Sequence, residues 1–519
     1  MQKRPNFLVI HTDQQRYDCV GIAGRREGIY TPSIDSIGYQ GAHFTSAYAT
    51  CPLCIPQRMS LLTGQLPEHH GLYSNTGIPY IPLQTTLPAE MRKGGYQTAL
   101  VGRTMHTYPV DLSYGFEYYL PGDPSSEKKE TTDAFFQYLR DHTTKDCGGY
   151  YGGGSSNNSR ASYPFHLSDE CHQTKWATNR ALDFLESRDP SRPYMLFVGY
   201  YAPHSPHNPP AELYREYYGR DDLDQPYLSE WDIPPVSSGN LMSRYHTLSK
   251  EEHRRLLAGY YGNIAFIDSQ VNRLIAKAAM DRNTYVIFTS DHGEMLGDHY
   301  LMQKNRPYQG AVHIPFLMMG PGIADSQVID APVGWHDIMP TILDLAGLQI
   351  PASVDGRSLA PLLQGNKPDD WRETIHGECC HDNLFDAKSR PVSEKHNFVY
   401  EKGSHYVTDG KMKYIWYVTS GKEQLFDLRF DEKEQLDLAQ KAEYAAVMER
   451  FRSILIKNLS DRPEGFTDGI KLIAGCTPQK TSPAMAALAQ QRQNEGFTLA
   501  FGHRRSPLDN LEYENNLMK

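Results

Sequence analysis

The clearest pattern in the sequence is a pair of mostly apolar runs, each followed directly by polar residues. Asn6–His11 leads into Thr12–Gln15, and Thr284–Thr289 leads into Ser290–Glu294. Short apolar runs bounded in this way are typical of strands that are buried on both faces of a sheet. The sequence therefore predicts two central strands whose carboxyl ends both carry acidic residues.

Further strands and helices alternate between these two runs. Gln97–Val101 and Tyr194–Tyr200 are strand candidates, and Lys175–Ser187 and Lys250–Ala278 have helical character. This alternation predicts an α/β fold with a mostly parallel central sheet flanked by helices. Because ligands bind beyond the carboxyl ends of the strands in such sheets, the polar strand ends mark the expected site.

The pattern changes at about residue 372, where short strand candidates replace the long alternation. We expect a catalytic domain over residues 1–371 and, over residues 372–519, a smaller α+β subdomain with an antiparallel sheet and a polar tail. The strands and helices expected in this second part are Met412–Val418, Gln424–Leu428, Gln440–Asn458 and Ala484–Gln493.

A glycine-rich stretch interrupts the first part at residues 146–163. It contains the run Cys-Gly-Gly-Tyr-Tyr-Gly-Gly-Gly followed by serines and asparagines. Such a composition predicts a long flexible loop. This loop either forms a rim over the site or is a plain surface insertion.

Composition narrows the class of protein. The net charge of −10 argues against a nucleic-acid binder, because the phosphate backbone is bound by clustered lysines and arginines. It is compatible with a small anionic ester held in a local basic pocket. No apolar run approaches the length of a membrane span, and Phe7–Ile10 is too short for a signal-peptide core, so we expect no membrane contact and a cytoplasmic location.

The eight cysteines form no secreted-type disulfide pattern, but Cys51 and Cys54 make a C-x-x-C within a longer motif. Pro56 suits the first turn of a helix and Gly64 suits its end. Cys54 is then expected just ahead of the helix N-terminus, where free N–H groups favour an anion, and Arg58 adds a positive charge one turn later. A redox pair, half a zinc site, or a buried thiol beside a surface arginine remain alternatives.

The segment Cys51–Gly64 resembles the signature of the type I sulfatases of the alkaline phosphatase superfamily. This resemblance implies an alkaline-phosphatase-like fold. It also implies that a separate enzyme oxidises Cys54 to formylglycine, an aldehyde whose hydrate supplies the attacking oxygen. Residues 337–347, 355–359 and 424–428 resemble further landmarks of the family, so the likeness extends to about residue 460.

The resemblance also implies a divalent metal ion, most simply Ca²⁺, with Mg²⁺ or Mn²⁺ as alternatives. Gln14 departs from the aspartate that many sulfatases carry and is found in the branch that includes choline sulfatases and phosphonate monoester hydrolases. Without the resemblance, Asp291 and His292 would be read as a capped turn. The implied metal ligands are Asp13, Gln14, Cys54 as formylglycine, Asp291 and His292.

Roles in catalysis and substrate binding follow from the same resemblance. Arg58 is expected to steady the hydrate and His106 to deprotonate it, while His204 and Lys304 act on the departing oxygen. Arg103 stands where the family has a lysine, with one extra residue before His106. The residues expected to bind substrate are Asn75, Arg103 and His207. The side chains near the expected pocket that suit a sugar, but could equally belong to the core, are Tyr80, Tyr108, Tyr201, His207 and Arg306.

The function implied is hydrolysis of a sulfate ester on a carbohydrate, such as a mono- or disaccharide derived from a glycosaminoglycan. The implied partners are that substrate, a formylglycine-generating or anaerobic sulfatase-maturating enzyme, and a second copy of the chain in a homo-oligomer. Two alternatives stay open. One is a phosphonate monoester or phosphodiester hydrolase of the same superfamily, and the other is a non-catalytic binding protein with an unmodified Cys54.

Overall fold

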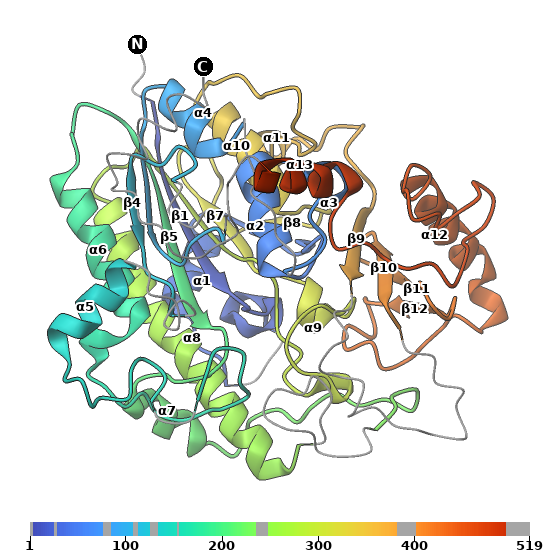
Figure 1. Ribbon diagram of the computed structural model, residues 1–519, viewed down its shortest axis with the longest axis horizontal. Helices are drawn as coiled ribbons and strands as arrows, with labels where there is room; N and C mark the ends of the chain where they lie inside the picture. Colours follow the sequence, from blue (N-terminus) through green and yellow to red (C-terminus); the bar gives the residue numbers. More distant parts are fainter. Residues whose placement is uncertain are drawn as a thin grey trace.

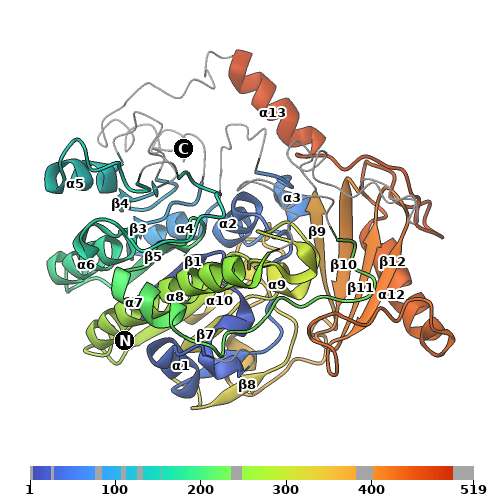
Figure 2. The ribbon, with the colours of Figure 1, turned by 90° about the horizontal axis from the view of Figure 1, so that it is seen from below.

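The computed structural model describes residues 4–24, 28–75, 85–106, 113–124, 133–152, 155–234, 248–380 and 401–494. These residues form a large α/β part and a smaller sheet covered by a helix. In two perpendicular views the smaller sheet lies beside the large part, at the right of both pictures (Figure 1 and Figure 2). Among the described residues, none of the helices combines the length and apolar character needed to cross a membrane.

An eight-stranded sheet forms the centre of the large part, in the order β4-β3-β5-β1-β6-β7-β2-β8. Neighbouring strands are parallel except where β7 pairs with β6 and with β2. The predicted mostly parallel sheet is therefore confirmed. The strands are β1 (Asn6–Asp13), β2 (Ala42–Phe44), β3 (Gln97–Gly102), β4 (Tyr118–Pro121), β5 (Tyr194–Pro203), β6 (Thr284–Ser290), β7 (Phe316–Met319) and β8 (Gln327–Ile329).

Helices cover both faces of this sheet, as the alternating pattern predicted. The longest, α8, begins with a capping box in which Ser249 and Glu252 bond each other's backbone N–H groups. The helices are α1 (Pro32–Tyr39), α2 (Cys54–Thr63), α3 (Pro67–His70), α4 (Leu87–Lys93), α5 (Ala134–His142), α6 (Gln173–Ser187), α7 (Ala211–Tyr218), α8 (Lys250–Ala278), α9 (Gln309–Val312), α10 (Ile338–Leu345), α11 (Ala360–Leu363), α12 (Ala445–Asn458) and α13 (Pro483–Asn494).

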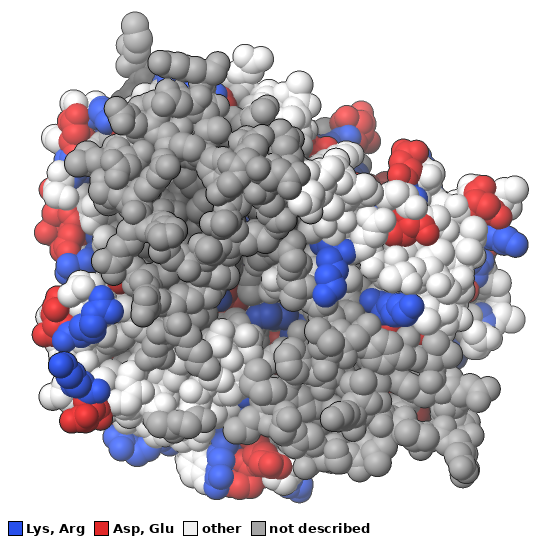
Figure 3. Space-filling view, in the orientation of Figure 1, with Lys and Arg blue, Asp and Glu red and all other residues white. Residues whose placement is uncertain are grey.

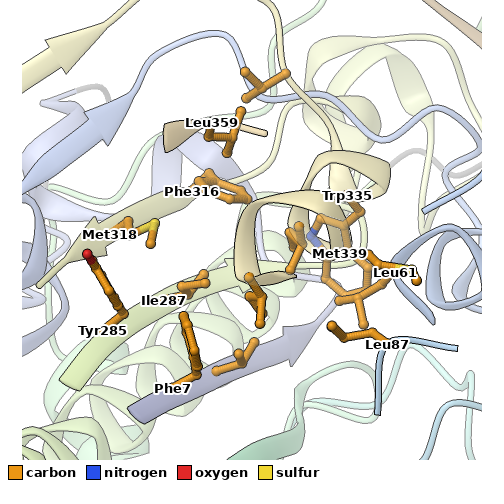
Figure 4. Close-up of a cluster of buried hydrophobic side chains, with 14 of the residues drawn as sticks. Phe7, Leu61, Leu87, Tyr285, Ile287, Phe316, Met318, Trp335, Met339 and Leu359 are labelled. Carbon is orange, nitrogen blue, oxygen red and sulfur yellow. The ribbon is translucent and has the colours of Figure 1, made fainter. Parts of the chain in front are cut away.

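Side chains of β1 alternate between two hydrophobic cores, one on each face of the sheet. Phe7 and Val9 pack with residues of α2, α4 and α10, a core seen in Figure 4. Leu8 and Ile10 pack with residues of α1, α6 and α8. Because each fully buried aliphatic or aromatic side chain stabilises the fold by about 1.5–3 kcal/mol, the two cores hold β1 and its polar end firmly in place.

The smaller sheet is antiparallel and has four strands in the order β12-β11-β10-β9. Tyr414 and Trp416 of β11 pack against α12, whereas Ile415 and Tyr417 pack against the large part of the molecule. The expected antiparallel unit is confirmed, and the domain boundary near residue 372 stays a prediction. The strands are β9 (Ile375–Cys380), β10 (Gly403–Thr408), β11 (Met412–Tyr417) and β12 (Glu423–Asp427).

The described parts of the glycine-rich stretch, residues 146–152 and 155–163, form a loop without helix or strand, as expected, and part of this loop is buried. Its flexibility stays a prediction. Tyr150 and Tyr151 are buried in one of the two main cores. Residues 158–163 lie along residues 205–207, with His207 N donating to Ala161 O at 2.9 Å. The packing of these two tyrosines in the core therefore anchors the stretch, although glycines surround them.

The segment that leads into α13 returns to the large part of the molecule beside α2 (Figure 1). Ser482 N donates to Gly71 O at 2.8 Å, and Tyr73 N donates to Lys480 O at 3.0 Å. Met485 packs against a small apolar cluster that includes Ile55 of α2. The end of the described chain thus supports the helix that carries Cys54.

The surface charges give no basic face for a polyanion on the side shown in Figure 3. Over the described residues of that face, lysines and arginines are interspersed with aspartates and glutamates. This mixture accords with the overall charge of −10.

Helix α2 begins at Cys54, which was expected just ahead of the helix, so that Pro56 lies in the first turn as predicted, and the helix ends as predicted at Gly64. Pro56 is tolerated as the third helical residue because the first N–H groups of a helix have no partner within the helix. Gly64 has a left-handed φ of 67°, and its carbonyl accepts from Asp355 N and Gly356 N. A Cβ atom at Gly64 would lie 2.8 Å from Val354 Cγ1.

We expect Gly64→Ala to lower the apparent free energy of unfolding by about 2–4 kcal/mol, because it adds a clash to an unfavourable left-handed conformation. Gly347→Ala is the matched control. Gly347 has the same φ of 67°, but nothing lies within 4 Å of its added Cβ atom. Urea unfolding followed by circular dichroism should show a loss of only about 1–2 kcal/mol for the control. Equal losses in the two variants would contradict the packing account.

Candidate active site

Four ligand-type side chains meet where β1, β6 and α2 converge. Asp13 ends β1, Asp291 and His292 follow β6, and Cys54 is the first residue of α2. One donor atom from each lies within 4.8 Å of the others, and all four residues are buried. No other group of three or more histidine, cysteine or acidic residues arranged to hold a metal ion occurs in the part of the chain that the structure describes.

Distances within this cluster are short. Cys54 Sγ lies 3.2 Å from His292 Nε2 and 3.7 Å from Asp13 Oδ1. His292 Nδ1 lies 3.0 Å from Gly293 O, which directs Nε2 into the cluster. Burial lowers the pKa of His292. A neutral imidazole with Nε2 free to bind is the form that ligates metals.

Burial raises the pKa of the Cys54 thiol to about 12, and the charge of Asp13 adds to this effect. The unmodified thiol is therefore protonated at neutral pH.

Arg58 lies under the cluster and binds both of its carboxylates. Its Nη2 donates to Asp13 Oδ2 at 2.8 Å and to Asp291 Oδ2 at 2.9 Å, and its side chain is fully buried. Burial would raise the pKa of Asp13, but the neighbouring cations, Arg103 foremost, outweigh burial and hold that pKa well below its usual range. Asp13 is therefore ionised in the folded protein.

Arg103, at the end of β3, is brought to the same place. Its Nε donates to Asp13 Oδ2 at 3.0 Å, its Nη1 donates to Asp123, and its guanidinium lies 4.7 Å from the centre of the Tyr201 ring. Sequence reasoning missed Asp123. The available signal was its position two residues after β4, at the same edge of the sheet as the other polar strand ends.

His106 stands at the margin of the cluster. Its Nδ1 lies 3.6 Å from Asp123 Oδ2, and its side chain is 20% exposed. Burial and the charge of Arg103 lower its pKa well below the ordinary value. His106 is therefore a neutral imidazole at neutral pH, which suits a group that accepts a proton.

His204 and Lys304 face each other across the site. Lys304 Nζ donates to His204 Nε2 at 2.8 Å and to Gln14 Oε1 at 2.7 Å. His204 Nδ1 lies 2.7 Å from Ser205 O, so its Nε2 is the acceptor. Burial and the charge of Lys304 lower the pKa of His204 well below its ordinary value. The structure thus joins the two residues assigned to the departing oxygen and connects them to Gln14.

The residues expected to bind substrate lie in different settings. Asn75 Oδ1 accepts from Ile55 N at 3.0 Å, which fixes the start of α2. His207 is buried, with Nδ1 2.9 Å from Pro203 O and its ring against Tyr260. Arg103 belongs to the network around Asp13. Their contacts with a substrate stay predictions.

The aromatic and basic side chains considered for a sugar give no further support. Tyr80 and Tyr108 lie outside the described residues. Tyr201 lies beneath Arg103, and its hydroxyl donates to Ser205 O at 2.7 Å. Arg306 is buried, and its Nη1 donates to Asn305 O. Tyr201 therefore packs against Arg103 and supports its position in the site.

The mostly parallel sheet, with its buried polar cluster at the strand ends, is a mixed α/β architecture that solved structures share. The phosphonate monoester hydrolase of Agrobacterium radiobacter superimposes with a TM-score of 0.70 at 24% identity, covering 88% of this chain and 96% of that one. The expected alkaline-phosphatase-like fold is confirmed.

The chain belongs to the sulfatase family. The sulfatase family profile matches residues 5–348, and the profile of the C-terminal region of N-sulphoglucosamine sulphohydrolase matches residues 297–461. The arylsulfatase of Clostridium perfringens is 35% identical over 91% of this chain and 98% of its own length. The N-acetylglucosamine-6-O-sulfatase of Bacteroides thetaiotaomicron is 22% identical over 87% of this chain and 86% of its own length. The protein is therefore a sulfuric ester hydrolase.

Replacing Arg103 with lysine should lower kcat/KM for 4-nitrophenyl sulfate about 10- to 100-fold, because one ammonium group cannot replace the two separate nitrogens that bind Asp13 and Asp123. Arg192→Lys is the control, since Arg192 binds Glu117 at the surface. Steady-state kinetics of protein made together with a formylglycine-generating enzyme would measure the effect. Unchanged activity in the Arg103 variant would show that lysine serves equally well here.

Proposed function

We propose that this sulfatase removes sulfate from a sulfated carbohydrate, using formylglycine made from Cys54 and a divalent metal ion. The observation that carries the proposal is the position of Cys54 at the N-terminus of α2, within 4.8 Å of Asp13, Asp291 and His292. A merely structural cysteine would not need to lie among two buried carboxylates and an imidazole.

The side chains around Cys54 suit a divalent cation. Asp13 and Asp291 offer carboxylate oxygens, His292 offers Nε2, and Gln14 offers an amide oxygen that faces Lys304. An oxygen-rich set favours Ca²⁺, with Mg²⁺ and Mn²⁺ as alternatives. The ion would offset the charge of the ester oxygens and of the attacking group.

Formylglycine would supply a hydrated aldehyde, with one hydroxyl to attack sulfur and a second to release the product. Arg58 holds the two carboxylates beside position 54 in place by donating to both. Neutral His106 can accept the proton of the second hydroxyl when the sulfated intermediate breaks down. Lys304 carries a proton 2.8 Å from His204 Nε2, so this pair can deliver it to the departing alkoxide.

The proposed substrate is a small sulfated sugar, such as a glycosaminoglycan-derived mono- or disaccharide. The support is the full-length similarity to an N-acetylglucosamine-6-O-sulfatase. We further propose that the chain is modified by a formylglycine-generating or anaerobic sulfatase-maturating enzyme, acts in the cytoplasm and forms a homo-oligomer.

Cys54→Ala should remove turnover of an aryl sulfate, a fall of about 10⁴-fold or more, because the attacking group is lost. Cys51→Ala is the matched control. Cys51 is also buried, but its Sγ lies 3.6 Å from Tyr73 O, away from the cluster. The control should keep its rate within about threefold. In the wild type, mass spectrometry of the peptide that contains residue 54 should show a loss of about 18 Da. An active alanine variant would refute the nucleophile.

A second candidate is a phosphonate monoester or phosphodiester hydrolase, which Gln14 favours. The discriminating experiment compares sulfated mono- and disaccharides, an aryl sulfate and a phenyl phosphonate. We expect kcat/KM to be highest for a sulfated sugar, because the chain belongs to the sulfatases. Faster cleavage of the phosphonate would favour the second candidate, and turnover of the aryl sulfate alone would refute the sugar substrate.

A further inference from the structure

Glu294 is a buried carboxylate close to the cluster that has no assigned part in it. It lies three residues after Asp291 and is 1% exposed. Its two oxygens have different partners. Oε1 accepts from the backbone N–H groups of Leu296 and Gln303, whereas Oε2 accepts from the side-chain nitrogen of Gln14.

Gln14 is held at each of its polar atoms. Its backbone N–H donates to Asp291 Oδ1 at 3.0 Å, and its carbonyl accepts from Tyr260 at 2.7 Å. Its side-chain Nε2 donates to Glu294, and its Oε1 accepts from Lys304 at 2.7 Å. Its backbone φ of 75° is unusual for a residue with a side chain. These hydrogen bonds together fix the orientation of the Gln14 side chain in the folded protein.

We propose that Glu294 is a positioning residue that sets the direction of the Gln14 amide, so that Oε1 faces Lys304 and the proposed cation. Glu294 Oε2 accepts from the NH₂ group of Gln14, so that group lies on the Glu294 side of the amide. The oxygen of the amide must then point the other way. This inference rests on the proposed metal site, in which Gln14 is a ligand.

The same contact explains why glutamine stands at position 14. A carboxylate there would face the buried carboxylate of Glu294, and two like charges side by side are unfavourable. An amide presents a donor to Glu294 and an acceptor to the site. Glutamine thus combines two requirements that aspartate or glutamate could not meet together.

Glu294→Gln is the sharpest test because it changes one atom. Leu296 and Gln303 still require an acceptor at Oε1, so the new NH₂ group must occupy the place of Oε2. That group would face the NH₂ of Gln14. The Gln14 amide must then either turn over, which also sets its NH₂ against the Lys304 ammonium, or move away from position 294, and either change displaces its oxygen from the proposed cation. We expect affinity for Ca²⁺ to fall at least about tenfold, the range found when partners of metal ligands are removed.

The measurement is isothermal titration calorimetry of Ca²⁺ into full-length protein first dialysed against a chelator, with thermal unfolding as a check of folding. Asp298→Asn is the matched control. Asp298 is a buried acid of the same segment whose carboxylate accepts from Arg16 and from Tyr227 N. Its dissociation constant should stay within about threefold of wild type. An equal loss in this control would show a general effect of charge and would overturn the proposal.

The double variant Glu294→Gln with Gln14→Glu exchanges the two groups. The carboxylate introduced at position 14 would accept from the amide at position 294 and keep an oxygen toward Lys304, so Ca²⁺ affinity should return to within about threefold of wild type. If the single variant does not fold, the double variant decides the question, and its failure to fold or to bind Ca²⁺ overturns the proposal. Unchanged affinity in the single variant does so too. Wild-type protein that binds none of Ca²⁺, Mg²⁺ and Mn²⁺ in the same titration would instead refute the metal site itself.

Discussion

The structure depends on the burial of two carboxylates of like charge at the ends of adjacent strands. Thr12 of β1 pairs with Ser290 of β6, and this parallel register places Asp13 and Asp291 side by side. Both are fully buried, so they would repel each other and take up protons without a counter-charge. Arg58 supplies it by donating to both.

Because Arg58 must lie between Asp13 and Asp291, the position of helix α2 is set, and the position of Cys54 on that helix is set with it. Arg58 is the fourth residue after Cys54, so the two lie about one turn apart along the helix. The helix is held at its start by Asn75, at its end by the left-handed Gly64 and along its side by Met485. Segments far apart in the sequence therefore restrict the movement of one thiol. That arrangement resembles a preorganised nucleophile position, because the supporting contacts exist before any substrate arrives.

The sequence predicted the parts of this arrangement that depend on local pattern. The polar ends of β1 and β6 follow from apolar runs, and the spacing from Cys54 to Arg58 follows from the helix that contains them. Asp123 and Glu294 could not be found in this way. Their partners, Arg103 and Gln14, stand 20 and 280 residues away in the chain, so only the folded sheet brings each pair together.

Local signals predicted less where a segment's contacts lie elsewhere in the chain. Glycines around residues 146–163 indicated a loop, but they gave no sign that Tyr150 and Tyr151 pack in the core. Pro56 indicated the first turn of α2, but it did not fix the first residue of the helix, which is Cys54. In both cases the local composition identified the type of segment and left its exact placement to its neighbours.

The balance of charge in the site limits which esters it can distinguish from one another. Its described lysine, arginine and acidic side chains are the cations Arg58, Arg103 and Lys304 and the acids Asp13, Asp123, Asp291 and Glu294. These nearly cancel, so the proposed divalent ion would leave a small positive charge, suited to an ester with one negative charge. Sulfate monoesters, phosphonate monoesters and phosphodiesters all meet that condition. Discrimination among them must therefore also come from the alcohol side, near His204 and Lys304, where the segment around Asn158 approaches: Asn158 O accepts from Gln303 Nε2 at 2.6 Å, directly beside Lys304.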